Sequence, residues 1–213
     1  MMSFDFNKDC IQRTLELQKK GLARSLKPLI PKMNCVVGFE GLEVVSFCSN
    51  DYLGVSERSD LRNRFATSMV SGNFGSTGSR LLSGERLAHG YLENELASWL
   101  GYESGLLFPT GYQANLGALS SILTKDDCAI FDREVHASII DGCRLSRAKL
   151  MVYRHLDLVG AQRCVDRASK KYDRIMLITE SLFSMSGRYA PLTVLEEIVR
   201  ERNVFFMSMR LMH

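Results

Sequence analysis

The stretch 105-GLLFPTGYQANLGALSSILTKDDCAIFDREVHASIIDGCRLS-146 decides the fold of this 213-residue chain. Two short apolar runs, Gly105–Phe108 and Cys128–Phe131, each lead into a helical pattern, the first starting near Gly111 and the second at about Ala137. Short apolar runs that alternate with helices of about 10–15 residues are typical of a parallel sheet with crossover helices. We therefore predict an α/β fold with a mostly parallel sheet, in which ligands bind beyond the carboxyl ends of the strands.

The same alternation continues along the chain on both sides of this stretch. Further strands are expected at Leu150–Tyr153, Ile175–Thr179 and Val204–Met207. Further helices are expected at about 60–71, 86–100, 157–171 and 192–202. No repeat and no linker interrupts this pattern, so one large domain is expected over residues 46–206.

The N-terminal segment, residues 1–45, has a different pattern. Apolar residues at helical spacing predict an amphipathic helix over Phe4–Ser25. Two apolar runs within Val36–Phe47 flank Glu40-Gly41, which predicts a β-hairpin.

Composition excludes several classes of protein. Hydrophobic residues make up 46% and charged residues 24% of the chain, which is ordinary globular usage and argues against disorder. The net charge is only +3 and no five like charges are adjacent, which argues against nucleic-acid binding. No stretch of about 18 apolar residues suggests a membrane span.

The cysteines indicate a reducing compartment. The six cysteines are scattered, and no C-x-x-C pair indicates a zinc or thioredoxin-type site, so no metal is expected. Met1–Asp9 is polar and acidic and has no apolar core of a signal peptide. A cytoplasmic protein without disulfides is the expectation.

Polar residues that follow the strands are the candidate site residues. After Phe108, Thr110 and Gly111 open a helix, which offers either a phosphate cup or an ordinary N-cap. After Phe131, His136 is placed to stack on a ring or move a proton, or else to cap a helix.

Three further loops carry weaker signals. Glu180 and Ser184 follow the strand that ends at Thr179, in a loop rich in turn formers. Arg80 lies in a Gly/Ser-rich loop and could clamp a carboxylate, although a flexible surface loop explains the same residues. Asn50 could contact a substrate or cap a turn.

The order of the motifs is more specific than any one of them. The series is S-N-D-Y-L-G (49–54), G-S-T-G-S-R-L-L-S-G (75–84), H-x-x-L-E-x-x-L-A-x-W-L-G (89–101), L-F-x-T-G-Y-x-A-N (107–115), H-A-S-I-I-D-G-x-R-L-S (136–146) and T-E-S-L-F-S-M-S-G (179–187). From about residue 20 to residue 206 this series resembles the α-oxoamine synthases. These enzymes use pyridoxal 5'-phosphate (PLP) and have the aspartate-aminotransferase-type fold, so the resemblance implies the N-terminal part of that PLP-binding large domain.

The resemblance also implies roles for the candidate residues around the cofactor. His136 would stack on the pyridine ring, with Ser184 at the phenolic oxygen and Glu180 beside it. Gly111 and Tyr112 would give backbone N–H groups to the phosphate.

The substrate side of the site is implied less securely. Asn50 would lie by the substrate and Arg24 near a carboxylate, while Arg80 stays the candidate clamp.

The family reaction is a decarboxylative condensation of an amino acid with an acyl thioester. R-L-L-S-G and T-G-Y-x-A-N favour the biotin-pathway member, whose substrates are L-alanine and a pimeloyl thioester. Glycine C-acetyltransferase and 5-aminolevulinate synthase share most of the other motifs and stay alternatives. The carrier, coenzyme A or acyl carrier protein, is open, and the family pattern is a homodimer.

Some family motifs are missing from the 213 residues. Absent are the D-E-A-H or D-D-A-H motif, whose aspartate pairs with the pyridine nitrogen, the Schiff-base lysine and the small C-terminal domain. Met207–His213 can be written with codons that, in a shifted frame, encode Val-Asp-Glu-Ala-His-Ala, so residues 207–213 are predicted to be an out-of-frame tail. The domain is then incomplete, and we expect an inactive, poorly soluble fragment. The alternative is a non-catalytic partner-binding subunit.

Overall fold

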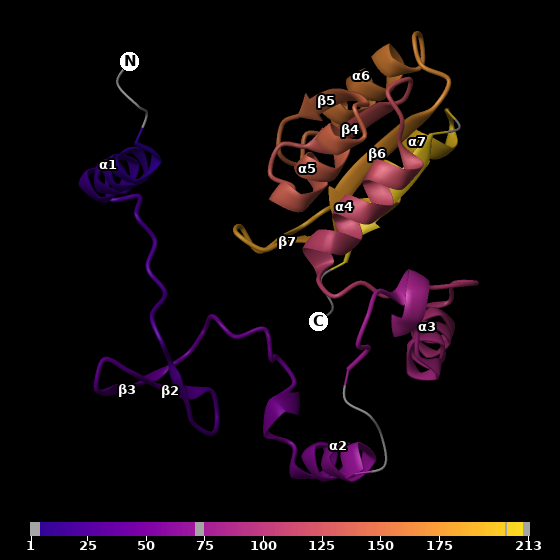
Figure 1. Ribbon diagram of the computed structural model, residues 1–213. Coiled ribbons are helices and arrows are strands. Elements are labelled where there is room, and N and C mark those ends of the chain that lie inside the picture. Colours follow the sequence, from indigo (N-terminus) through magenta and orange to yellow (C-terminus); the bar gives the residue numbers. More distant parts are fainter. Residues whose placement is uncertain (1–4, 71–74, 203, 211–213) are drawn as a thin grey trace. The chain divides into compact units, whose positions relative to one another are not determined.

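Figure 1 shows the computed structural model, which describes residues 5–70, 75–202 and 204–210. The chain divides into two units, Met1–Phe74 and Gly75–His213. The expected helix start at Phe4, the loop residues 72–74 and the tail residues 211–213 lie outside the described residues.

The first unit opens with α1 (Phe6–Lys19), which is shorter than expected. Asp5 caps its start by accepting a hydrogen bond from the Lys8 N–H at 3.1 Å. The prediction that the helix continues to Ser25 is wrong, because Gly21 adopts a left-handed φ of 65° just beyond the last turn. A glycine in this conformation commonly ends a helix.

The predicted hairpin is confirmed. Strands β2 (Val36–Phe39) and β3 (Leu42–Val45) pair antiparallel, and β1 (Ile30–Pro31) adds to β2. Both turn residues, Glu40 and Gly41, have positive φ, as a tight two-residue hairpin loop requires.

The rest of the first unit holds a short 3₁₀ helix, η1 (Val55–Glu57), and α2 (Ser59–Val70). Asp51 caps η1 by accepting hydrogen bonds from the N–H groups of Val55 and Ser56, and the Ser56 contacts lower the pKa of its carboxyl. None of the described residues of this unit is buried.

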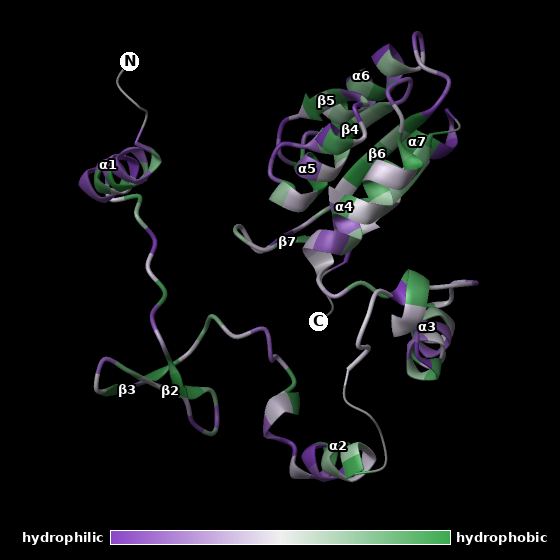
Figure 2. Ribbon diagram, in the orientation of Figure 1, coloured by the Kyte–Doolittle hydropathy of each residue, from purple (hydrophilic) through white to green (hydrophobic). Residues whose placement is uncertain are grey.

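The second unit is built on a four-stranded parallel sheet of order β5-β4-β6-β9, which confirms the predicted fold class. Its strands are β4 (Cys128–Asp132), β5 (Lys149–Tyr153), β6 (Ile175–Glu180) and β9 (Phe205–Met209). Every residue of β4 and β6 is buried, and both strands are largely apolar in Figure 2. Strands covered on both faces are typical of parallel sheets.

Helices complete the layers of this unit. In Figure 1, α4 (Gly111–Ile122) and α5 (Ala137–Leu145) lie side by side, and they pack against each other. Helix α6 (Leu158–Ala168) packs against β4, β5 and β6, while α7 (Leu192–Arg200) packs against β9. The continuous core formed in this way includes Leu119, Ile130, Ile139, Val165, Leu177 and Leu195.

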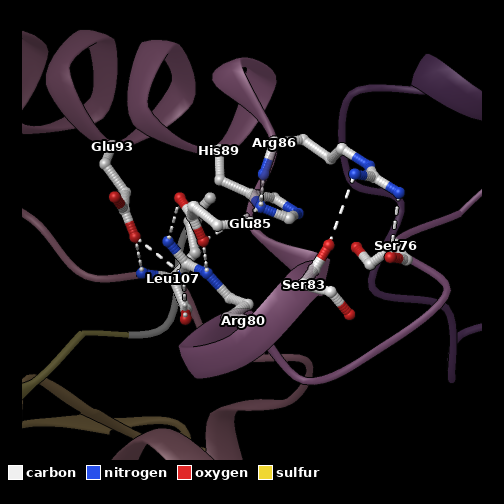
Figure 3. A network of polar contacts seen from close by, with 8 residues as sticks. All are labelled: Ser76, Arg80, Ser83, Glu85, Arg86, His89, Glu93 and Leu107. Atoms are coloured by element: carbon white, nitrogen blue, oxygen red, sulfur yellow. Dashed lines mark hydrogen bonds and ion pairs between the residues drawn. The ribbon is translucent and has the colours of Figure 1, made fainter.

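The segment before α4 differs from the prediction. Residues 105–108 form no strand in the part of the chain that the structure describes. The Leu107 peptide is bonded instead by side chains: its N–H donates to Glu93 Oε1 at 2.8 Å, and its carbonyl accepts from Arg80 Nη1 at 3.1 Å (Figure 3). An apolar run becomes a strand only where another strand satisfies its backbone.

Four remaining elements complete the second unit. A turn of π-helix, η2 (Arg80–Gly84), precedes α3 (Leu87–Leu100), on which Trp99 is 72% exposed. Strands β7 (Leu182–Phe183) and β8 (Arg188–Tyr189) form a small hairpin after β6. Across the described residues of both units, no helix is long and apolar enough to cross a bilayer.

Candidate active site

A cavity of about 470 Å³ lies in the second unit, where strands β4 and β9 end. Its lining residues are Gly111, Tyr112, Ala114, Asn115, His136, Ser138, Ser184, Met207, Ser208, Met209 and Arg210. Four predicted site residues from three separate loops, Gly111, Tyr112, His136 and Ser184, are thus brought together. The cavity is at the edge of the sheet where parallel α/β folds bind ligands.

The start of α4 forms one wall of the cavity. Thr110 caps the helix by accepting from the Gln113 N–H at 3.1 Å, so the N-cap interpretation is correct for this residue. A capped helix still leaves N–H groups of its first turn without an intrahelical partner, and these together with the helix dipole favour an anion. Capping by Thr110 is therefore compatible with a phosphate cup at Gly111 and Tyr112.

The Tyr112 side chain is fixed at the cavity wall. Its hydroxyl donates to the Asp141 carboxylate of α5, and this contact raises the pKa of the tyrosine. The ring lies edge-on to His136, with 6.0 Å between ring centroids and 78° between planes.

His136 caps the start of α5 with its own side chain. Nδ1 accepts from the Ser138 N–H at 3.2 Å and lies 2.7 Å from Ser138 Oγ. Capping and ligand contact are again compatible, because the cap uses Nδ1 while the residue lines the cavity.

Glu180 lies behind His136 and is not among the residues that line the cavity. It ends β6, is 2% exposed, and accepts a hydrogen bond from the backbone N–H of His136. Burial raises the pKa of this carboxyl, and the hydrogen bond from His136 opposes part of that effect. In this structure Glu180 fixes the loop that carries His136.

A second buried carboxylate, Asp132, holds the other end of the same loop. Asp132 ends β4 and accepts from the Glu134 N–H at 2.8 Å, the Leu156 N–H at 2.8 Å and His155 Nδ1 at 3.0 Å. Asp132 was not among the residues predicted from the sequence, although an acidic residue directly after a buried apolar strand is a signal for a loop anchor. Asn115 and Ser138, which stand inside two of the quoted motifs, were not predicted either.

Arg80 is already paired in this structure. Its guanidinium contacts Glu85 at 2.5 Å and Glu93 at 2.9 Å, and these carboxylates, Glu85 first, raise its pKa further (Figure 3). A role for Arg80 as a carboxylate clamp stays a prediction. Arg24 and Asn50, both exposed, belong to the first unit, and their predicted substrate contacts also stay predictions.

The cavity offers a helix N-terminus, an aromatic pair and a serine hydroxyl. Such a set suits a ligand with an anionic end and a flat ring. No group of three or more His, Cys, Asp or Glu residues within residues 5–70, 75–202 and 204–210 could hold a metal ion.

Comparison with known proteins identifies the family of the chain. The family model described as aminotransferase class I and II matches residues 43–208. The chain belongs to this family. Curated relatives named 8-amino-7-oxononanoate synthase share 41% identity over 191 residues in Anaeromyxobacter sp. (strain K) and 36% over 192 residues in Geobacter sulfurreducens. These matches cover 89% and 90% of this chain, and the resemblance to α-oxoamine synthases is confirmed.

The chain spans about half the length of these curated relatives, 48% and 49%. A serine palmitoyltransferase variant from S. paucimobilis, solved with a bound PLP–myriocin aldimine, matches 96% of this chain and 52% of its own, at 24% identity and a TM-score of 0.83. An 8-amino-7-oxononanoate synthase from Francisella tularensis matches 71% of this chain and 41% of its own, at 31% identity and a TM-score of 0.57. Because its identity is only 24%, the serine palmitoyltransferase structure supports the fold alone.

Proposed function

We propose that the chain carries the PLP-binding part of an 8-amino-7-oxononanoate synthase. Such an enzyme condenses L-alanine with a pimeloyl thioester and releases carbon dioxide and the thiol carrier. The observation that carries this proposal is the convergence of the α4 N-terminus, His136 and Ser184 on one cavity. The names of the relatives favour this reaction over those of glycine C-acetyltransferase and 5-aminolevulinate synthase.

The donor set of the cavity fits PLP. The N–H groups of Gly111 and Tyr112 would hold the phosphate, because a helix N-terminus supplies both donors and a positive potential. His136 would lie against the ring, and Ser184 would hold the phenolic oxygen. The cavity of about 470 Å³ is in the size range of cofactor sites.

PLP supplies an electron sink for the charge that develops on the amino-acid substrate. The residues of this chain bind and orient. Glu180 and Asp132 hold the His136 loop from two strands, so the ring is positioned before any ligand arrives. Preorganisation of this kind lowers the cost of binding and of reaching the reactive geometry.

We further propose that the 213-residue chain alone does not turn over. The lysine that attaches the cofactor and the aspartate that pairs with the pyridine nitrogen have no counterpart in the family motifs found here. In the shifted frame, the aspartate codon overlaps the codons of Ser208 and Met209, and both of these residues line the cavity. This supports the proposal that residues 207–213 are out of frame, which sequencing the DNA from the Asn203 codon onward tests.

A titration with PLP and with pyridoxal tests the proposed site. The 213-residue chain is expected to bind PLP, followed by the change in PLP absorbance, and to bind pyridoxal at least about tenfold more weakly because the phosphate contacts are lost. His136→Leu is expected to weaken PLP binding. The matched control is Ser121→Ala, because the Ser121 hydroxyl donates to the Ala118 carbonyl at 3.0 Å within α4.

Two results would contradict the proposal. Equal affinity for pyridoxal and PLP would show that Gly111 and Tyr112 do not bind the phosphate. PLP binding unaffected by His136→Leu would show that His136 does not contact the ring. If borohydride fixed PLP covalently to one lysine of the 213-residue chain, the proposed lack of turnover would need revision.

A further inference from the structure

Asn115 and Ser138 are buried polar residues on the wall of the cavity, and the proposed function leaves them without a role. Their exposed fractions are 7% and 0%. Asn115 comes from α4 and Ser138 from α5, so they join the two helices behind His136. Buried side chains of this kind are retained where their hydrogen bonds are all made.

The side chains of Asn115, Ser138 and His136 are connected in series by hydrogen bonds. Asn115 Nδ2 donates to Ser138 Oγ at 2.9 Å, and Ser138 Oγ lies 2.7 Å from His136 Nδ1. The same Asn115 Nδ2 lies 3.0 Å from Met209 Sδ, a weak acceptor. Both contacts favour the orientation of the Asn115 amide in which its nitrogen, and not its oxygen, faces Ser138.

The backbone N–H of Ser138 fixes which atoms donate and which accept in this series of hydrogen bonds. The Ser138 N–H can only donate, and it contacts His136 Nδ1 at 3.2 Å. Nδ1 therefore presents a lone pair, and the Ser138 hydroxyl, which accepts from Asn115, donates its own proton to the same atom. A neutral imidazole with Nδ1 as acceptor carries its proton on Nε2.

We propose that Asn115 and Ser138 are positioning residues that hold His136 as the neutral Nε2–H tautomer. The ring then offers one N–H donor, and its other nitrogen is occupied inside the protein. Glu180 does not compete for the ring, because its carboxylate accepts from the backbone N–H of His136. The link to catalysis rests on the proposed function, whereas the tautomer itself does not depend on it.

Nitrogen-15 NMR of the imidazoles in the cofactor-free chain tests this directly. The chain has four histidines, and His136→Gln assigns the signal of interest. At about pH 8.5, roughly two units above the ordinary histidine pKa, His136 is expected to show an acceptor-type Nδ1 signal and a protonated Nε2 signal. A protonated Nδ1 in the unsubstituted chain would overturn the proposal.

Substitutions separate positioning from simple stability. Ser138→Ala removes the hydroxyl donor to Nδ1 and keeps the backbone N–H donor, so the Nδ1 signal is expected to move part of the way toward the protonated position. Asn115→Leu is expected to move it by a smaller amount. Ser121→Ala, matched in chemistry, is expected to leave both signals unchanged. If Ser138→Ala leaves the His136 signals unchanged while the chain stays folded by circular dichroism, the assigned role is wrong.

PLP titration of the same variants distinguishes the two proposals. Ser138→Ala is expected to weaken PLP binding by about two- to tenfold, the usual effect of one lost hydrogen bond. If the unsubstituted chain shows the Nε2–H tautomer but binds no PLP, the proposed function fails and the tautomer assignment stands.

Discussion

Glu180 and Asp132 end neighbouring strands, and the carboxylate of each accepts a hydrogen bond from a backbone N–H of the loop between β4 and α5. Burial raises the pKa of the Glu180 carboxyl. In the folded chain Glu180 therefore keeps its proton at pH values where Glu180 of the unfolded chain, with an ordinary pKa of 4.5, has released it. The free energy of unfolding then falls as the pH rises from about 4.5 through the raised pKa.

Glu180→Gln is expected to remove this pH dependence. The amide oxygen can still accept from the His136 N–H, while no charge is buried. The melting temperature of the variant, relative to the original chain, should therefore rise as pH increases from about 4 to about 7. Thermal unfolding followed by circular dichroism across this range measures the difference.

Glu180→Ala is the matched comparison. It leaves the His136 N–H without its acceptor, so the free energy of unfolding should fall by about 1–3 kcal/mol. If Glu180→Gln were destabilising by as much at neutral pH, a charged carboxylate would be essential and the burial argument would be wrong.

The convergence of several candidate residues on one cavity could be predicted from the sequence, because position after an apolar run is a local property. Gly111, Tyr112, His136 and Ser184 all follow apolar runs, and the structure brings them to one cavity. The pairing of Arg80 could not be predicted in this way. Its partners Glu85 and Glu93 are set by how η2 meets α3, which depends on tertiary packing.

At the scale of elements, the contact between α4 and α5 depends on one glycine. A Cβ added at Gly142 would lie 2.9 Å from the Asn115 carbonyl oxygen and 3.0 Å from Leu119 Cβ. Gly142→Ala is therefore expected to force the helices apart and to lower the free energy of unfolding by about 1–3 kcal/mol. Urea unfolding measures this loss.

Gly90 on α3 provides the control for that prediction. Nothing lies within 4 Å of a Cβ added there. Gly90→Ala is expected to stabilise the chain by about 0.5–1 kcal/mol through helix propensity alone. If Gly90→Ala and Gly142→Ala changed the free energy of unfolding in the same direction, close packing between α4 and α5 would not explain the Gly142 result.

Most elements could be predicted because their periodicity is local, and the exceptions have identifiable causes. Gly105–Phe108 has the apolar pattern of a strand, but Glu93 and Arg80 bond the Leu107 peptide instead. Helix α1 stops six residues early at Gly21, and none of its residues is buried, unlike those on the apolar face of α7, so packing does not extend it. Periodicity indicates an element, whereas its partners decide where it ends.

At the scale of the whole molecule, the two units differ in how they are stabilised. The buried apolar core lies in the second unit, and none of residues 5–70 is buried. Since burial of apolar surface is the main stabilising term, the first unit should open far more often than the second.

Limited trypsin digestion measures this difference. We expect the earliest cuts after exposed basic residues of the first unit, such as Lys19, Lys20 and Arg24. A longer-lived fragment should retain residues 111–202. Mass spectrometry identifies the fragments. Early cleavage within α6, after Arg163 or Arg167, would contradict the assignment of the core to the second unit.

Trp99 gives the chain a built-in optical probe. It is the one tryptophan among the 213 residues, and it is 72% exposed on α3. An indole in water emits at longer wavelength than one covered by apolar atoms. Emission excited selectively from tryptophan therefore reports on a single helix. A shift to shorter wavelength on mixing with a second protein that contains no tryptophan would place that protein against α3 without any added label.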